Sequence, residues 1–243
     1  MAVAATALTA GNSETDATSY ATASISPTGN RLVLAVVRTW RAAGEPGDTA
    51  TATGGGMTTW TKVATRAAAG ARMTLFRALQ ASPTSGAVTF GFGGVESQDA
   101  AAWAILEFSD VVTTGTNGAD AVVQSATGAG TSTTPLATLA AFGDAGNATF
   151  GSIGSYNATD HTAPGTGFTE IQETGNGDTR VATEFRNDND TTVNATLDNS
   201  VEWDVIAVEI AAAVVGGDPE GSLVGGKLIR GGLLKHGVLV RAA

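Results

Sequence analysis

The chain has 243 residues, 15% of them charged, and a formal net charge of −10. This length accommodates one large core in a single domain, and so acidic a chain would repel nucleic acid and anionic membranes. The sequence has no cysteine, which excludes a disulfide framework and a thiolate metal site, and no run of about 18 apolar residues that would predict a transmembrane helix.

Short runs of Val, Thr, Phe and Trp alternate with clusters of Gly, Asn, Asp and Ser along the chain. This alternation predicts an all-β protein with an antiparallel β-sandwich. One segment, Ala67–Ser82, contains enough Ala, Leu and Arg for a helix, but its match to a later run favours a strand. In the first half the expected strands are Ser19–Ile25, Leu32–Trp40, Thr59–Ala64, Met73–Leu79, Ala87–Phe92 and Ala101–Phe108. In the second half they are Asp120–Gln124, Ala137–Phe142, Ala148–Tyr156, Phe168–Glu173, Val181–Phe185, Thr191–Leu197 and Val205–Ile210.

The two halves of the chain repeat one another. A glycine turn followed by a strand at Gly55–Val63 matches Ala163–Ile171 at an offset of 108, and a later block matches at an offset of 102. The aligned pairs are Trp60 with Phe168, Arg72 with Arg180, and Glu107 with Glu209. A duplication of roughly 100 residues explains these matches.

A five-stranded half would expose one apolar face. We therefore expect the two halves, about residues 19–112 and 120–212, to close face to face as one sandwich within a body of residues 1–215. The alternative is two separate small β domains.

Residues 216–243 differ from the rest of the chain. Apolar doublets recur there every five residues, a period that fits neither a helix nor a strand, and glycine pairs separate several of them. Four basic residues lie among the doublets, with no acidic residue after Glu220. We expect an extended docking or oligomerisation tail whose apolar doublets contact another chain. These assembly residues are Leu223, Val224, Leu228, Ile229, Leu233, Leu234, Val238 and Leu239.

Several blocks over about Asp16–Ala212 resemble, in order, a jelly-roll-like β-sandwich module of tailed-bacteriophage virion proteins and related bacterial sequences. They are TDATSYATASISPTGNRLVLAVV, TLFRALQASPTSGAVTFGFGG, AWAILEFSDV, PGTGFTEI and VIAVEI. The later segment LVGGKLIRGGLL is similar to the short Gly- and Leu-rich ends of phage structural proteins. The resemblance implies a structural protein located in the virion, as a head decoration, a fibre or a tail component.

Residues suited to nucleophilic hydrolysis are few. His161 lies beside Asp160 in a loop, His236 lies in the tail, and the sequence has no G-x-S-x-G motif. We therefore expect neither histidine to be catalytic.

Glu107 and Glu209 could form the pair of carboxylates that a glycosidase requires. Each, however, is the polar member of an apolar strand, and the repeat itself explains why the two match. We therefore expect structural glutamates, either exposed or paired with an arginine such as Arg72 or Arg180, and we do not expect an enzyme.

Two acidic or amide-rich segments, Asn187–Asp190 and Gly175–Asp178, offer oxygen ligands for calcium. Neither has the spacing of an EF-hand, and Asn and Asp are common turn residues, so turns are favoured. Gly91–Gly94 lacks the Lys-Ser/Thr of a phosphate loop. We expect neither a metal nor a cofactor.

The four tryptophans could stack on sugar rings. Trp103 and Trp203 belong to apolar strands and are expected in the core, whereas Trp40, which precedes a polar loop, is the one to test for exposure. Packing in a core or an interface is favoured for all four, Trp60 included.

These observations predict a structural virion protein whose body is displayed on the particle and whose tail anchors or oligomerises it. Its partners would be other virion proteins and copies of itself, and a trimer would bury the doublets. The start, MAVAATALTAGNSETD, has no basic region ahead of a hydrophobic run, so no signal peptide is expected. The alternative function is a secreted carbohydrate-binding or adhesive module that recognises a host surface glycan.

Overall fold

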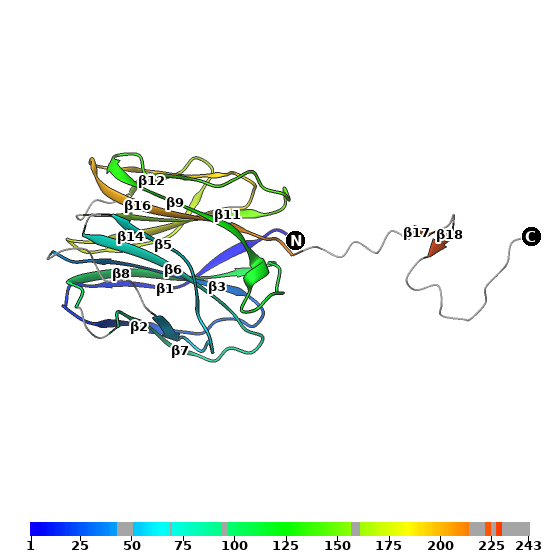
Figure 1. Ribbon diagram of the computed structural model, residues 1–243, viewed down its shortest axis with the longest axis horizontal. Coiled ribbons are helices and arrows are strands. Elements are labelled where there is room, and N and C mark those ends of the chain that lie inside the picture. The colour runs from blue at the N-terminus through cyan, green and yellow to red at the C-terminus, as the bar shows by residue number, and fades with distance from the viewer. Residues whose placement is uncertain are drawn as a thin grey trace, which may run out of the picture. The chain divides into compact units, whose positions relative to one another are not determined.

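The computed structural model describes residues 1–42, 51–68, 70–93, 97–156, 161–213, 222–224 and 227–229. The chain divides into two compact units, a body of Met1–Ala213 and a unit of Val214–Ala243. The body is an all-β antiparallel sandwich, as the sequence predicted, and Figure 1 shows its stacked layers of strands. Within the described residues, no helix is long and apolar enough to cross a membrane.

The described part of the first half of the body forms two antiparallel sheets. The strands are β1 (Ala4–Ser13), β2 (Ser19–Ile25), β3 (Leu32–Trp40), β4 (Thr51–Gly54), β5 (Thr61–Ala68), β6 (Ala71–Leu79), β7 (Gly86–Gly91) and β8 (Ala100–Ser109). Five of them pair in the order β1-β8-β3-β6-β5, and the other three pair in the order β2-β7-β4. This is a jelly-roll-like sandwich, because strands distant in sequence alternate across two facing sheets.

The second half of the body repeats this topology strand by strand. After a single 3-10 turn, η1 (Ala119–Ala121), its strands are β9 (Val122–Ser132), β10 (Leu136–Thr138), β11 (Ala148–Ser155), β12 (His161–Pro164), β13 (Thr169–Gly175), β14 (Arg180–Arg186), β15 (Thr192–Leu197) and β16 (Val201–Ile210). The large sheet has the order β9-β16-β11-β14-β13 and the small sheet the order β10-β15-β12. Each order is that of the first half with every strand number raised by eight, so the structure contains the duplication that the sequence indicated.

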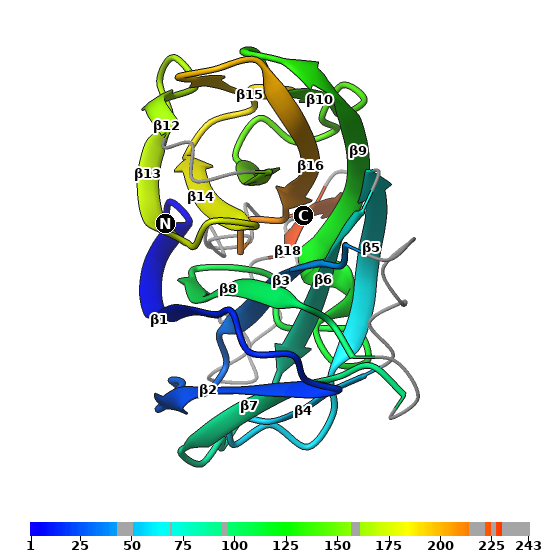
Figure 2. The same cartoon turned by 90° about the vertical axis from the view of Figure 1, so that its left-hand side faces the viewer.

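The two large sheets pack face to face, which gives the body four layers instead of the two that we expected. Figure 2 shows the layers end-on, with β2, β7 and β4 on one outside and β10, β15 and β12 on the other. A central core between the large sheets contains residues from both halves, including Leu34 and Leu106 from the first and Phe150 and Ile206 from the second. Each half also has an outer core of its own, between its large and its small sheet. The body is therefore neither one simple sandwich nor two separate domains.

The halves are related by an approximate two-fold axis. The first strand of each half lies against the fifth strand of the other, so that β1 lies beside β13 and β5 beside β9 (Figure 2). This reciprocal pattern is that of an isologous interface between two copies of one subunit. The body is in effect a dimer joined into one chain.

Strand burial follows from this layering. In β3, which contains the run LVLAVV, the side chains on both faces are buried, because one face lies in the central core and the other in an outer core. In β2, on the outside, buried and exposed residues largely alternate. Continuous apolar runs are typical of strands that are buried on both faces. Alternation of apolar and polar residues is typical of strands with one solvent-exposed face.

Most of the predicted strands exist, including the ambiguous one, which is β6. Among the described strands of the body, three were missed, namely β1, β4 and β12, because β1 consists mainly of Ala, Thr and small polar residues and the other two are only four residues long. The strand predicted to end at Gln124 continues to Ser132. Such segments carry little intrinsic β propensity, and their pairing with apolar neighbours determines their conformation.

In the second unit, two short strands pair with each other in antiparallel fashion. They are β17 (Ser222–Val224) and β18 (Lys227–Ile229), with Leu223 opposite Leu228. One residue of each of the first two apolar doublets is thus paired with the other, whereas the backbone of Val224 pairs with that of Lys227 and the backbone of Ile229 with that of Ser222. The sequence analysis expected an extended segment and did not predict this pairing.

Candidate functional site

Glu107 is buried on β8 and holds the segment that leads into β3. Its Oε2 accepts a hydrogen bond from the backbone N–H of Thr28 at 2.7 Å, and its Oε1 accepts one from the Thr28 hydroxyl at 3.0 Å. The guanidinium of Arg31 donates to Oε1 at 2.6 Å. Both carboxylate oxygens are thus occupied by the protein itself.

Glu209 has the matching place on β16 and the matching role. It is buried, and the amides of Gln124 and Asn147 each donate to its carboxylate at 2.6 Å. The position of Asn147 ahead of β11 corresponds to that of Arg31 ahead of β3. Both glutamates are buried and hydrogen-bonded within the protein. Glu107 is paired with an arginine, but with Arg31 and not with the suggested Arg72 or Arg180, and Glu209 is held by two amides.

The two segments considered as calcium loops are turns. The side-chain oxygen of Asn176 accepts the backbone N–H groups of Asp178 and Thr179, and its amide nitrogen donates to the carbonyl oxygen of Ser13 in the other half. In the second segment Arg186 binds the carboxylates of Asp188 and Asp190, each at 2.7 Å. Among the described residues, no group of three or more His, Cys, Asp or Glu side chains could hold a metal ion.

Three of the four tryptophans pack against an apolar core. Trp103 and Trp203 are 7% and 8% exposed and belong to the two outer cores. Each covers a glycine on the first strand of its own half, Gly11 and Gly130 respectively. Trp60 lies against the outer core of the first half and donates to the carbonyl oxygen of Gly54 at 3.0 Å. Trp103 and Trp203 are thus buried, whereas Trp60 is partly exposed.

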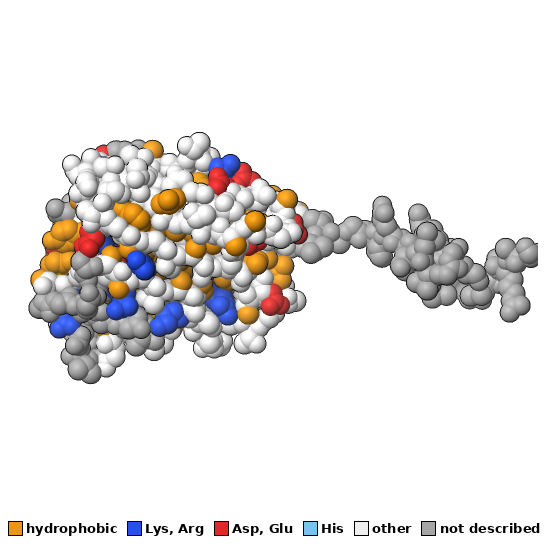
Figure 3. Space-filling view, turned by 45° about the horizontal axis from the view of Figure 1, so that its top comes forward, with side chains coloured by type: hydrophobic (Ala, Val, Ile, Leu, Met, Phe, Trp, Pro, Cys, Tyr) orange, Lys and Arg blue, Asp and Glu red, His pale blue; other side chains and the backbone are white. Residues whose placement is uncertain are grey.

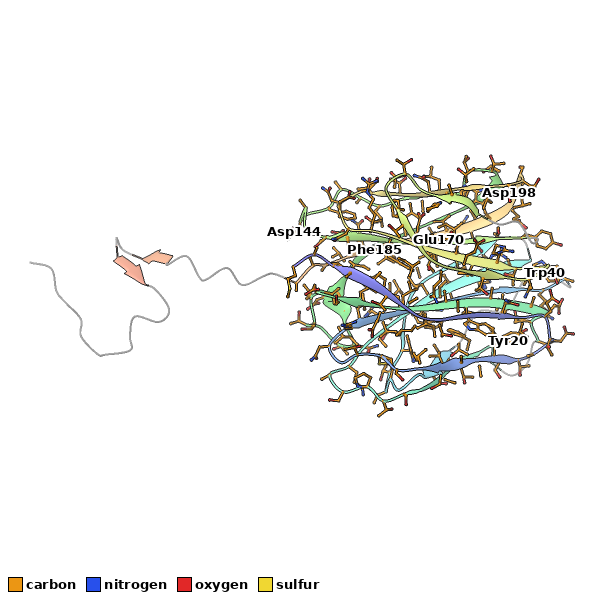
Figure 4. All side chains as sticks on the ribbon, turned by 180° about the vertical axis from the view of Figure 1, so that it is seen from behind. Tyr20, Trp40, Asp144, Glu170, Phe185 and Asp198 are labelled. Carbon is orange, nitrogen blue, oxygen red and sulfur yellow. The ribbon has the colours of Figure 1, made fainter. Side chains whose placement is uncertain are left out.

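Trp40 is partly exposed and lies against Tyr156, with the ring centroids 5.7 Å apart. Trp40 ends β3 and Tyr156 follows β11, so the two rings occupy equivalent positions in the two halves. Figure 4 shows Trp40 at one end of the body, with Asp144 at the opposite end. Trp40 is the tryptophan that the sequence identified for an exposure test, and its contact with Tyr156 of the other half was not predicted.

Glu184 is a functional candidate that the sequence analysis missed. It is 1% exposed on β14, and its Oε2 accepts a hydrogen bond from the backbone N–H of Gly165 at 2.9 Å. Its Oε1 has no hydrogen-bond partner among the described residues. Burial raises the pKa of this carboxyl to about 7, the nearby carboxylates of Glu170 and Asp190 add to the increase, and hydrogen bonds from the backbone oppose it.

The repeat shows why Glu184 is unusual. Glu184 pairs with Gly151 on β11, as Phe76 pairs with Ala35 on β3. Phe76 belongs to the outer core of the first half, so an ionisable group replaces an aromatic ring in the second. A signal was present in the sequence, since this glutamate interrupts the apolar run RVATEF.

Some of the remaining residues that the sequence analysis named are described by the structure, and others are not. His161 begins β12, where its backbone pairs with that of Leu197. The doublet residues Leu223, Val224, Leu228 and Ile229 belong to β17 and β18. His236, Leu233, Leu234, Val238 and Leu239 lie outside the described residues.

The surface of the body is mixed in character. Figure 3 shows hydrophobic, basic and acidic side chains interspersed in small groups over the visible face. The class that this fold defines is an all-β protein of two fused jelly-roll-like sandwiches. Comparison with known proteins adds no family name: no protein-family model, curated protein sequence or solved structure matches the chain.

Proposed function

We propose that the chain is a structural component of a tailed-bacteriophage virion, displayed on the particle and anchored or oligomerised through its tail. The sequence blocks that resemble virion modules motivate this proposal. The structural observation that supports it is that Met1–Ala213 forms a compact unit with cores of its own.

The three cores of the body are built from residues of the body itself. Among the described residues, every member of these cores lies at or before Ala212. The body also closes on itself there, because Val111 and Ala212 form an isolated β-bridge. Apolar doublets that follow a finished fold are suited to contact with another chain.

The carboxylates also argue for a structural role over a catalytic one. Glu107 and Glu209 are each held by two or more groups of the protein. A glycosidase needs one carboxyl to protonate the leaving group and another to attack or activate water, and neither buried glutamate is placed to do so.

Removal of residues 214–243 tests the proposal. We expect the truncated chain to keep the circular dichroism of the body and to lose both its oligomeric state and its attachment to particles. A matched pair of full-length variants separates the doublets from the charges: Leu228→Asp should abolish attachment, whereas Lys227→Ala should retain it. Unchanged assembly after truncation would refute this role of the tail.

The second candidate is a carbohydrate-binding or adhesive module, which the Trp40 and Tyr156 ring pair favours. Aromatic faces stack on sugar rings, and these two come from different halves at one end of the body. A glycan array probed with the full chain and with Trp40→Ala tests it. Binding that Trp40→Ala removes and Trp203→Phe retains would support this candidate over the first.

A further inference from the structure

Among the described residues, the interface between the halves contains one buried ion pair, and it is asymmetric. Arg38 on β3 and Asp204 on β16 are both 0% exposed, and Nε of Arg38 donates to Oδ1 of Asp204 at 2.9 Å. Nη1 of Arg38 also donates to the Ser155 carbonyl oxygen at 3.0 Å and to the Thr179 hydroxyl at 2.9 Å. The cation belongs to the first half and every one of these acceptors belongs to the second.

The strand registers identify the counterparts of these residues. In the first half Arg38 pairs with Ala102, and in the second Gly154 pairs with Asp204. The neighbouring pairs agree, since Val33 pairs with Glu107 as Thr149 pairs with Glu209. Gly154 is therefore the counterpart of Arg38, and Ala102 is the counterpart of Asp204.

Arg38 and Gly154 also touch each other. A Cβ on Gly154 would overlap both the side chain of Arg38 and the carboxylate of Asp204. Equivalent positions that contact each other lie at the two-fold axis of an isologous interface. The ion pair therefore lies where a symmetric dimer would bring identical residues together.

Pairing of like halves would be unfavourable at this place. Two first halves would bring two Arg38 side chains together with no acid, because Asp204 is replaced by Ala102. Two second halves would bury two Asp204 carboxylates with no cation, because Arg38 is replaced by Gly154. A buried charge without a partner is costly.

The pair is not well suited to adding stability alone. Nη2 of Arg38 and Oδ2 of Asp204 have no hydrogen-bond partner among the described residues. A buried ion pair that is incompletely hydrogen-bonded often stabilises a protein less than apolar residues of similar size would. Its retention at the axis is better explained by discrimination between partners.

We propose that Arg38, Asp204 and Gly154 form a pairing code by which the first half recognises the second and rejects a like half from another copy of the chain. The code would keep first halves from pairing with first halves, and second halves with second halves, when many copies fold close together.

The test uses full-length chains that carry Arg38→Met, Asp204→Leu or both. Each single substitution leaves a buried charge unpaired and should raise the unfolding equilibrium constant by roughly 100-fold or more, whereas the double substitution should recover most of that loss. To measure interchain pairing, a tagged and an untagged copy are unfolded together and refolded. The amount of untagged chain that is then co-purified through the tag is quantified. The parent chain treated in the same way gives the background, including any association through the tail.

We expect the amount of interchain pairing to be several times greater for the double variant than for the parent chain. Below, such pairing of halves from different chains is called exchange. A mixture of the two single variants should also exchange, because one interface of an exchanged pair restores Arg38 with Asp204 and the other brings the two apolar substitutions together. Arg31→Met is the control, since it removes a cation paired with Glu107 within one half and should leave exchange at the background. The proposal is overturned if neither the double variant nor the mixture exchanges more than the parent.

Discussion

Replacement of Glu184 by glutamine tests whether a buried carboxyl makes the stability of the body depend on pH. The pKa of this group rises from 4.5 to about 7 because the side chain is buried. Each unit of pKa is worth about 1.4 kcal/mol, so the increase corresponds to about 3 kcal/mol at most.

The direction follows from proton binding. The folded state holds the proton of Glu184 more tightly than the unfolded state, so its stabilising contribution is complete below pH 4.5. It is lost as the pH rises to about 7. Above pH 7 the wild-type chain must bury a carboxylate whose Oε1 has no hydrogen-bond partner among the described residues.

Glu184→Gln removes this ionisation and retains an oxygen that can accept from Gly165. At pH 8 we expect the variant to be more stable than the wild type by about 2 kcal/mol, after about 1 kcal/mol is subtracted for the new amide donor. At pH 4.5 the advantage should vanish or reverse. Urea unfolding followed by tryptophan fluorescence at several pH values measures the difference.

Glu202→Gln is the matched control, because Glu202 is a partly exposed glutamate of the same half. The free energy of unfolding of the Glu202→Gln variant should differ little from that of the wild type at every pH. A difference between Glu184→Gln and the wild type that stays constant from pH 4.5 to pH 8 would refute the reasoning.

Three further predictions concern packing. Phe150→Ala should cost about 3–5 kcal/mol in urea unfolding and leave a single transition, because Phe150 packs edge-on against Phe108 of the other half; two separate transitions would contradict a shared core. Gly154→Ala should cost about 3 kcal/mol, because its Cβ would overlap the ion pair, whereas Gly143→Ala, with open space around it, should be nearly neutral; equal melting temperatures would disprove this. Glu107→Gln should lower stability by about 2 kcal/mol through its hydrogen bonds and change no glycan hydrolysis, as a reducing-sugar assay would show.

The sequence specified the apolar strands well. The bounds of β2 and β3 agree with the predicted ones, because Val, Ile, Leu and aromatic residues bounded by turn residues give a local signal. β1 gave no such signal, since it is held by its pairing with β8 and by the ring of Trp103 over Gly11. Long-range pairing of small residues cannot be read from a local window.

The number of layers was the main error, although a clue was present. We assigned one apolar face to each half, yet β3 and β16 contain continuous apolar runs, which are typical of strands buried on both faces. Strands of this kind in both halves required an additional layer on each outer side. The small sheets that supply those layers are built partly from β4 and β12, which are too short to predict.

The buried charged residues depend on the register between halves, and this register varies along the chain. The offset between equivalent residues is 116 for β3 and β11, 108 for β6 and β14, and 102 for β8 and β16. Only the last two offsets were visible in the sequence. Without the first, Arg38 could not be aligned with Gly154.

Fusion of the two halves makes such differences possible. In a dimer of identical subunits, any residue at the axis meets itself, so a cation there would face a cation. In a single chain the two copies can diverge, and they have done so where divergence matters most: Arg38 against Gly154, and Ala102 against Asp204. The outer core has diverged as well, with Glu184 in the place of Phe76. The duplicated fold therefore keeps the symmetry of its backbone, while its buried polar residues define two halves that are no longer interchangeable.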